Sequence, residues 1–406
     1  LEVVGEIPID LEGLYVRNGP NPRFPAGGRY HWFDGDGMLH GLHLEGGKAT
    51  YRNKWVRTDG FAAEAAEGQA LWQGVAEPRG GNPDDGSRLR LKDAANTDVV
   101  FHNGSLVALW YLAGAPYKVD PFSLETIGPD DWGGARDCSV SAHAKVDPRS
   151  GEFVFFDYGP TPPFMSYGVV SANGELTHHQ EVEVPGARMP HDMAITENHS
   201  VLMDLPLVVD PVSWAQGRHR LQFLGDTPAR FGVVARHGGP VQWFEAEPCY
   251  IYHSVNAWEE GDEIVMDVCR FRPPQPSSMD FKGPLASILN YLRLDAFLHR
   301  YRFNLRTGAT IETPLDDRNT EFPMVNQRLL GEKTRYAYNV SISSDTVMYF
   351  DGLVKYDTLA GTEERYGFGA GRYGSEAPFA PRPGATAEDD GYLLSFVYDA
   401  AVDRSE

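Results

Sequence analysis

Short apolar runs separated by turn residues recur along the whole chain. In one case, Val99–His102 is followed by the dipeptide Asn103-Gly104 and then by Ser105–Trp110. Asn-Gly and Gly-Gly between alternating apolar runs are typical of β-hairpins, because these tight turns need positive φ angles. Similar patterns span residues 42–55, 145–158, 167–175, 301–313 and 354–366. The sequence therefore predicts strand after strand, with little helix.

The length of the chain limits the number of architectures that these strands can form. The chain has 406 residues, whereas a single β-sandwich rarely exceeds about 250 residues. No linker rich in proline, glycine or serine divides it, so we predict one domain over residues 1–406. The predicted fold class is all-β, and a β-propeller is favoured over a sandwich or a barrel.

One segment departs from the strand pattern. Between Pro284 and His299, apolar residues recur at the i, i+3, i+4, i+7 spacing of an amphipathic helix. These residues are Leu285, Ile288, Leu289 and Leu292. We predict a helix packed on the propeller, within a cap or entrance insertion at about residues 270–300. The alternative is a lipophilic cap at a substrate entrance, or a peripheral membrane contact through residues 284–299.

The composition excludes several classes of protein. The chain has 36 basic and 57 acidic residues, a net charge of −21, which argues against nucleic acid as a partner. Its three cysteines form neither a CxxC motif nor a disulfide framework, which favours the reducing cytoplasm. The sequence shows no signal peptide and no apolar run of membrane-spanning length. Because the first residue is not Met, we expect a trimmed start.

Three of the 13 histidines lie in similar settings. His143, His191 and His253 each lie in or just before a short apolar strand, at intervals of roughly one propeller blade. Side chains from successive blades meet near the axis of a propeller, so this spacing is compatible with a metal site. A histidine that is hydrogen-bonded within the core is the alternative for each of them.

Six sequence blocks resemble the carotenoid cleavage oxygenase family. They are residues 13–22 (GLYVRNGPNP), 31–38 (HWFDGDGM), 191–196 (HDMAIT), 321–323 (EFP), 374–382 (GSEAPFAPR) and 389–399 (DDGYLLSFVYD). The blocks occur in family order over nearly the whole chain. The resemblance implies a seven-bladed β-propeller with a small helical cap. It also implies a non-haem Fe²⁺ held by four histidines, and cleavage of a conjugated alkene by O₂ into two carbonyl products.

The resemblance also implies roles for individual residues. His143, His191 and His253 match the first three iron ligands, and neutral imidazoles suit Fe²⁺. Glu321 and Glu376 match glutamates that accept hydrogen bonds from ligand histidines and thereby support the bound cofactor.

The sequence departs from the family pattern in two places. Tyr111 stands about where the family has a third glutamate, which we expect in the surroundings of His143. Tyr111 is therefore a candidate catalytic residue whose lack of charge alters iron affinity or potential. In addition, no histidine follows His299, so the fourth ligand has no match. We expect the chain to be a fragment with an incomplete last blade, and a three-histidine member is the alternative.

Within the family, the expected substrate is a lipophilic polyene, a carotenoid or an apocarotenoid, with O₂ as the second substrate. The alternative is a lignostilbene-type dioxygenase that cleaves phenolic stilbenes to aromatic aldehydes. The Lys and Tyr that typically bind the phenol are absent near residues 110–111 and 79–80. Two further alternatives are a non-catalytic carotenoid-binding propeller and a hydrolytic propeller with paired carboxylates, for which no pair is found.

Overall fold

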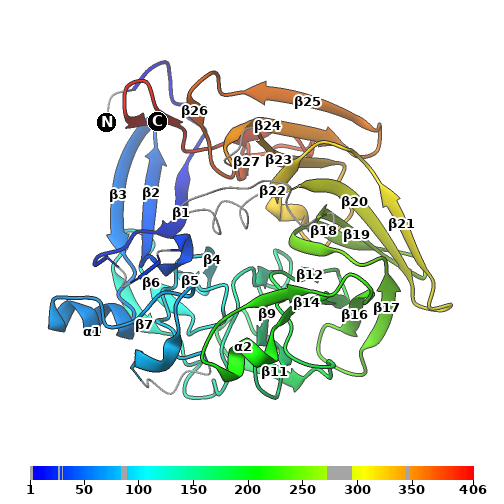
Figure 1. Cartoon of the computed structure of the whole chain (residues 1–406). Coiled ribbons are helices and arrows are strands. Elements are labelled where there is room, and N and C mark those ends of the chain that lie inside the picture. Colours follow the sequence, from blue (N-terminus) through cyan, green and yellow to red (C-terminus); the bar gives the residue numbers. More distant parts are fainter. Residues whose placement is uncertain (1–2, 26–27, 30, 84–88, 272–294, 344–347) are drawn as a thin grey trace. The chain divides into compact units, whose positions relative to one another are not determined.

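The chain packs as two compact units. Figure 1 labels the helices and strands of the chain. The computed structural model describes residues 3–25, 28–29, 31–83, 89–271, 295–343 and 348–406. Unit 1 comprises Leu1–Met193, Leu207–Leu224 and Arg236–Gly239; unit 2 comprises Ala194–Pro206, Gly225–Ala235 and Pro240–Glu406. The single domain over residues 1–406 stays a prediction.

Unit 1 contains three sheets of three or four strands and one two-stranded sheet among its described residues: β1-β2-β3, β4-β5-β6-β7, β8-β9-β10-β11 and β14-β15. The strands are β1 (Gly13–Pro20), β2 (Gly37–Glu45), β3 (Lys48–Trp55), β4 (Asp98–His102), β5 (Ser105–Leu109), β6 (Tyr117–Val119), β7 (Thr126–Pro129), β8 (Lys145–Val146), β9 (Phe153–Tyr158), β10 (Met165–Val170), β11 (Leu176–Glu181), β14 (Leu207–Val209) and β15 (Leu221–Phe223). The helices are α1 (Asp59–Glu67) and α2 (Pro211–Ala215), with short 3-10 turns η1 (Trp32–Asp34) and η2 (Arg79–Gly81).

The described part of unit 2 contains four sheets of three or four strands and one two-stranded sheet: β12-β13-β16-β17, β18-β19-β20-β21, β22-β23-β24-β25, β26-β29-β30 and β27-β28. The strands are β12 (Ala194–Ile195), β13 (His199–Asp204), β16 (Ala229–Ala235), β17 (Gln242–Ala246), β18 (Tyr250–Glu260), β19 (Glu263–Phe271), β20 (Ala296–Asn304), β21 (Thr310–Pro314), β22 (Thr320–Met324), β23 (Tyr336–Ile342), β24 (Phe350–Asp357), β25 (Thr362–Gly367), β26 (Arg372–Tyr373), β27 (Phe379–Pro381), β28 (Gly391–Leu393), β29 (Tyr398–Asp399) and β30 (Arg404–Ser405). One 3-10 turn, η3 (Gln327–Leu329), precedes β23.

The seven larger sheets are the blades of a β-propeller, which confirms the predicted all-β, seven-bladed fold. Neighbouring strands within each blade are antiparallel. The β4–β5 hairpin shows how the sequence specifies them: Asn103 and Gly104 adopt φ angles of +45° and +76°. Only residues that tolerate the left-handed region close such a two-residue turn.

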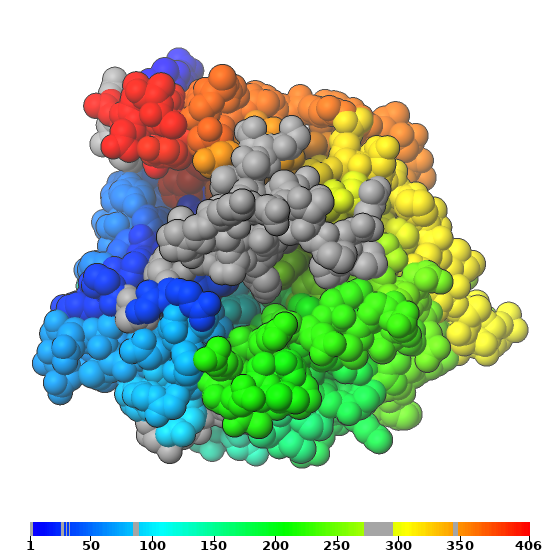
Figure 2. Space-filling view, in the orientation of Figure 1, coloured from blue at the N-terminus to red at the C-terminus, as the bar shows by residue number. Residues whose placement is uncertain are grey.

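The innermost packing of the blades is apolar, whereas their outer strands are polar. In unit 1, Leu39 of β2 packs with Leu106 and Ala108 of β5 and with Val119 of β6, and all four are buried. In unit 2, by contrast, all six residues of β25 are exposed, and this part of the unit is seen as orange atoms at the surface in Figure 2. Burial thus concentrates between blades.

The predicted helix over Pro284–His299 is wrong at its C-terminal end, and residues 284–294 lie outside the described residues. Residues from Ala296 onward form β20, which pairs with β19 from Phe271 to Glu263. Exposure alternates with period two from His299 to Asn304, so sheet pairing overrides the helical spacing there. No helix in the described part of the chain is long and apolar enough to cross a membrane.

Replacing Phe231 with Ala is expected to destabilise unit 2 by about 3–5 kcal/mol, because it leaves a cavity in an aromatic cluster. The Phe231 side chain is fully buried, and its ring centroid lies 4.6 Å from that of Tyr301 and 5.0 Å from that of Phe303. Thermal unfolding measures the change. Phe101→Ala, at a position 58% exposed, is the control and is expected to leave the midpoint nearly unchanged. Equal shifts for the two variants would contradict this packing.

Candidate metal centre

Two of the three candidate ligand histidines face each other in unit 1. His143 lies in the loop before β8, and His191 lies in the loop that follows β11. Their Nε2 atoms are 3.2 Å apart, and their ring centroids are 4.8 Å apart. Two nitrogens bound to one metal ion at about 2.1 Å lie about 3 Å apart when their bonds form a right angle. The pair therefore has the spacing of neighbouring ligands on one ion.

The main chain at His143 is strained, with a φ angle of +63°. Residues with a side chain rarely occupy this left-handed region, and such conformations concentrate at functional sites. Asp98, the first residue of β4, accepts a hydrogen bond from the His143 main-chain N–H at 2.9 Å. Its Oδ2 also lies 4.0 Å from the His143 Nδ1. The carboxylate thus supports the turn and faces the ring nitrogen that does not meet His191.

A buried ion pair connects the two histidine loops. The Nζ of Lys145 lies 2.7 Å from the Oδ1 of Asp192, whose side chain is only 1% exposed. Lys145 follows His143 by two residues, and Asp192 directly follows His191. Breaking a buried ion pair leaves an uncompensated charge, at a cost of about 3–5 kcal/mol. The ion pair therefore favours the arrangement in which the imidazoles meet.

The charge of Lys145 also acts on Asp98. The pKa of the Asp98 carboxyl lies above its ordinary value, mainly because the group is buried. The charge of Lys145 and the hydrogen bond from His143 lower this pKa, whereas the charge of Asp192 raises it. Two carboxylates and one ammonium group therefore lie close to the histidine pair, and this acidic excess favours a bound cation.

Tyr111 lies beside the second histidine of the pair. Its ring centroid is 6.1 Å from that of His191, and the carboxylate beside His143 is Asp98; the predicted role of Tyr111 in the surroundings of His143 stays a prediction. The main chain connects this region to the His143 loop, because Trp110 forms a β-bridge with Ser141. The main-chain oxygen of Tyr111 accepts a hydrogen bond from the Tyr158 hydroxyl.

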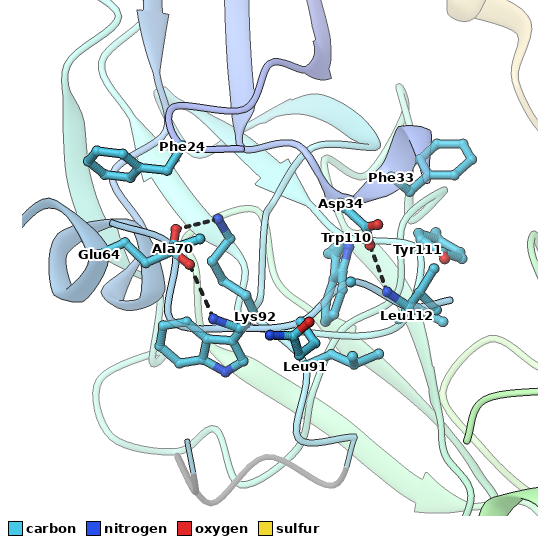
Figure 3. A pocket seen from close by; sticks show the side chains of 14 residues that line it. Phe24, Phe33, Asp34, Glu64, Ala70, Leu91, Lys92, Trp110, Tyr111 and Leu112 are labelled. Atoms are coloured by element: carbon cyan, nitrogen blue, oxygen red, sulfur yellow. Dashed lines mark hydrogen bonds and ion pairs between the residues drawn. The ribbon is translucent and has the colours of Figure 1, made fainter. Parts of the chain in front are cut away.

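A pocket in unit 1 extends from Tyr111 (Figure 3). The Phe33 ring centroid is 4.9 Å from that of Tyr111. The pocket is otherwise lined largely by apolar and aromatic side chains, namely Phe24, Trp72, Val75, Leu91, Trp110 and Leu112. Together with the polar residues Asp34, Glu64, Gln73 and Lys92, these side chains give the pocket a mixed apolar and polar wall around an open volume of about 30 Å³.

The charged residues of this pocket are already paired. The Nζ of Lys92 lies 2.8 Å from oxygens of both Asp36 and Glu64. Asp34 accepts hydrogen bonds from the main-chain N–H groups of His31 and Val75, each at 2.8 Å. The Lys92 charge is thereby neutralised within the protein.

The third candidate ligand, His253, lies on β18 in unit 2. Its Nδ1 is 2.5 Å from the Oε2 of Glu321, a fully buried residue of β22. The main-chain N–H of Phe322 donates to the same oxygen, and the Phe322 ring centroid lies 4.8 Å from that of His253. The pairing of β18 with β19 shifts register between Ile251 and Ser254, which redirects the side chain of His253. With Nδ1 engaged by Glu321, Nε2 is the nitrogen available to coordinate a metal ion.

Two further residues considered in the sequence analysis, Glu376 and His299, are both in unit 2. Glu376 is exposed in the loop before β27, and its role stays a prediction. His299 is a buried residue of β20, whose Nε2 lies 3.7 Å from Glu312. Burial, together with the Arg270 charge, lowers the pKa of His299 to about 4. Its ring is therefore neutral near pH 7.

Sequence reasoning missed Asp98, Lys145 and Asp192. A local signal existed for each of them, since Asp98 directly precedes the predicted strand Val99–His102 and the other two lie within two residues of a candidate ligand. Charged residues so close to buried apolar strands are rarely left unpaired. Their partners, however, lie far away in the sequence and are visible only in the folded chain.

The chain matches known proteins over its full length. Residues 1–406 match the family described as retinal pigment epithelial membrane protein. The chain is 36% identical over 440 residues to carotenoid 9,10(9′,10′)-cleavage dioxygenase 1 of Phaseolus vulgaris, covering 100% of this chain and 80% of that protein. It is 33% identical over 432 residues to apocarotenoid-15,15′-oxygenase of Synechocystis sp., covering 100% and 86%. The solved structure of Pseudomonas brassicacearum lignostilbene dioxygenase superposes with a TM-score of 0.88 at 28% identity, covering 100% and 88%.

Replacing either His143 or His191 with Ala is expected to lower the metal content of the purified protein by at least about tenfold, because each change removes one of two facing donors. Elemental analysis measures the content. His237→Ala is the control, since its side chain is 63% exposed and lies in the same unit. Undiminished metal in both single variants would exclude the pair as ligands.

Proposed function

This chain belongs to the carotenoid cleavage oxygenase family, described as retinal pigment epithelial membrane protein, and from that premise we propose that it is a carotenoid-cleaving dioxygenase. It splits one conjugated C=C bond of a carotenoid or apocarotenoid with O₂ and yields two carbonyl products. Both oxygen atoms enter the products, so the reaction needs no further reductant. The observation that carries the proposal is the pair of facing imidazoles, 3.2 Å apart, next to an aromatic pocket.

The family is iron-dependent, and we propose Fe²⁺ as the metal of this centre. His143 and His191 present two neutral nitrogen donors, and His253 with its buried partner Glu321 is the third proposed ligand. Imidazole nitrogens suit a borderline metal ion such as Fe²⁺. When bound, Fe²⁺ supplies the redox chemistry that activates O₂. The fourth histidine implied by the family resemblance stays a prediction.

The protein residues around the centre bind and orient the polyene. The ring centroid of Tyr111 is 4.9 Å from that of Phe33 and 6.1 Å from that of His191, so a substrate bound at the histidine pair contacts Tyr111 close to the reacting double bond. The aromatic side chains of Phe33 and Tyr111 exclude water there, which protects reactive species from side reactions. Asp98 and the Lys145–Asp192 pair keep the histidine loops in place and do not touch the substrate.

The pairing of Lys92 disfavours a phenolic stilbene, and a second property of the pocket favours a substrate that carries an oxygen acceptor. Lys92 is paired with Asp36 and Glu64, so its charge is not available to a phenolate. The indole nitrogens of Trp72 and Trp110 are buried and lack a hydrogen-bond partner among the described residues. Buried donors of this kind favour an acceptor such as a carbonyl or hydroxyl oxygen at one end of a polyene.

We also propose that the enzyme works in the cytoplasm and takes its lipophilic substrate from a membrane surface through the part of residues 284–299 that precedes the buried strand β20. All three cysteines, Cys138, Cys249 and Cys269, are free thiols, which agrees with a reducing compartment. Most of the proposed membrane-contact segment lies outside the described residues, so the support for it is the apolar pattern of the sequence.

Replacing Glu321 with Gln is expected to weaken iron binding by about 10–100-fold, because an amide oxygen is a poorer acceptor for the His253 N–H than a carboxylate. Equilibrium titration of the iron-free protein with Fe²⁺ under anaerobic conditions measures the affinity. Glu364→Gln, on the exposed strand β25, is the matched control. An unchanged affinity in the Glu321 variant would remove this residue from the centre.

Incubation of the iron-loaded protein with an apocarotenal and O₂ is expected to give two shorter carbonyl products, detected by liquid chromatography and mass spectrometry. With ¹⁸O₂, both products are expected to carry the label when exchange with water is controlled. A 4-hydroxystilbene tested in parallel is expected to react at least about tenfold more slowly, because no free cation binds its phenol. Cleavage of the stilbene alone would replace the proposed substrate class, and no cleavage of either by iron-loaded protein would overturn the proposed activity.

A further inference from the structure

A second group of metal-ligating side chains lies in unit 1, away from the histidine pair. It consists of Asp137, Cys138 and His179, and one ligand atom from each residue lies within 4.8 Å of those of the other two. Asp137 and Cys138 lie in the loop between β7 and β8, whereas His179 lies on β11, at the edge of the β8–β11 blade. Residues from two separate segments are therefore brought to one point on the surface of the blade.

The spacing of these groups suits a metal ion better than a hydrogen bond. The Oδ1 of Asp137 is 3.7 Å from the Nδ1 of His179, which is too far for a hydrogen bond. Ligands at about 2.0–2.3 Å around a tetrahedral ion lie about 3.3–3.8 Å from one another. The observed separation falls within that range.

The ring of His179 is held so that Nδ1 faces the cluster. Its Nε2 is 3.0 Å from the Oγ of Ser166 on β10, and its ring stacks on Phe155 with centroids 6.2 Å apart. When Nε2 donates to Ser166, the lone pair is on Nδ1, and this is the tautomer that binds a metal ion. A hydrogen bond to the second ring nitrogen is the usual support of a metal-bound histidine.

The electrostatic surroundings also favour a cation. Two carboxylates, those of Asp157 and Asp137, and one cation, Arg136, act on the Cys138 thiol. A divalent ion bound at this point offsets the excess of negative charge.

We propose that Asp137, Cys138 and His179 form a second metal site, separate from the catalytic histidines, which binds a borderline ion of the Zn²⁺ class. A mixed sulfur, nitrogen and oxygen donor set is typical of Zn²⁺. Binding forms one metal–sulfur bond and releases the thiol proton to water, while the imidazole and carboxylate bind without losing a proton. The bound ion connects the loop before β8 to strand β11. Cys138, in that loop, precedes His143 by five residues.

Cobalt(II) is the probe that separates this site from the catalytic centre. Thiolate ligation to Co²⁺ gives an intense charge-transfer absorption in the near ultraviolet, whereas the proposed ligands of the catalytic centre contain no sulfur. Titration of the iron-loaded protein with Co²⁺ is expected to give this absorption with one equivalent, and Zn²⁺ is expected to abolish it by competition. Cys138→Ala is expected to remove the absorption. His179→Ala and Asp137→Asn are expected to weaken Co²⁺ binding by at least about tenfold.

Matched variants serve as controls. Cys249→Ala removes a fully buried thiol of unit 2, and His178→Ala removes the neighbour of His179, whose Nε2 faces Gln180; both are expected to keep the absorption. No charge-transfer absorption in the wild type, or one that persists in Cys138→Ala, would overturn the site.

A measurement on the wild-type protein alone does not depend on whether the variants fold. Zn²⁺ is expected to slow alkylation of Cys138 by iodoacetamide, mapped by mass spectrometry, by at least about tenfold. Equal alkylation with and without Zn²⁺ would contradict the proposal. None of these readouts uses cleavage activity, so they remain decisive even if the proposed dioxygenase function fails.

Discussion

A buried ion pair between Lys145 and Asp192 holds two loops of unit 1 in the positions that their histidines need. The Nε2 atoms of His143 and His191, which belong to these two loops, lie 3.2 Å apart. The cost of separating two buried opposite charges favours that arrangement. Asp98 adds a second restraint, because it holds the strained main chain of His143 through the N–H of that residue. The centre is therefore built on charges that never contact the substrate.

The candidate ligands are supported in two different ways. His253 has a fully buried glutamate 2.5 Å from its Nδ1, which fixes the ring directly. His143 has a carboxylate 4.0 Å from its Nδ1, so its support acts mainly through the main chain. An imidazole with a close carboxylate partner is the more basic and the stronger ligand.

The pocket next to the centre holds one cationic side chain among several carboxylates. Lys92 is paired with both Asp36 and Glu64, and the side chain of Tyr111 carries no charge near pH 7. A polyene is uncharged, whereas a phenolate needs a cationic partner. Lys92 of this pocket is already paired with two carboxylates. We therefore attribute the proposed substrate preference to the pairing of Lys92 more than to the shape of the pocket.

The sequence by itself determined the strand pattern, the propeller and the candidate ligands, because hairpin turns and apolar alternation are local and the histidine blocks are recognisable in isolation. Asn103-Gly104 closes the turn that its sequence predicts. Residues 296–299 did not follow their helical spacing, since pairing with β19 is a long-range interaction. Only the tertiary structure placed Tyr111 beside His191, Asp98 beside His143 and Lys145 beside Asp192. Contacts of that kind form between segments that are distant in the sequence. The local pattern of apolar and polar residues does not specify which of these segments pack together.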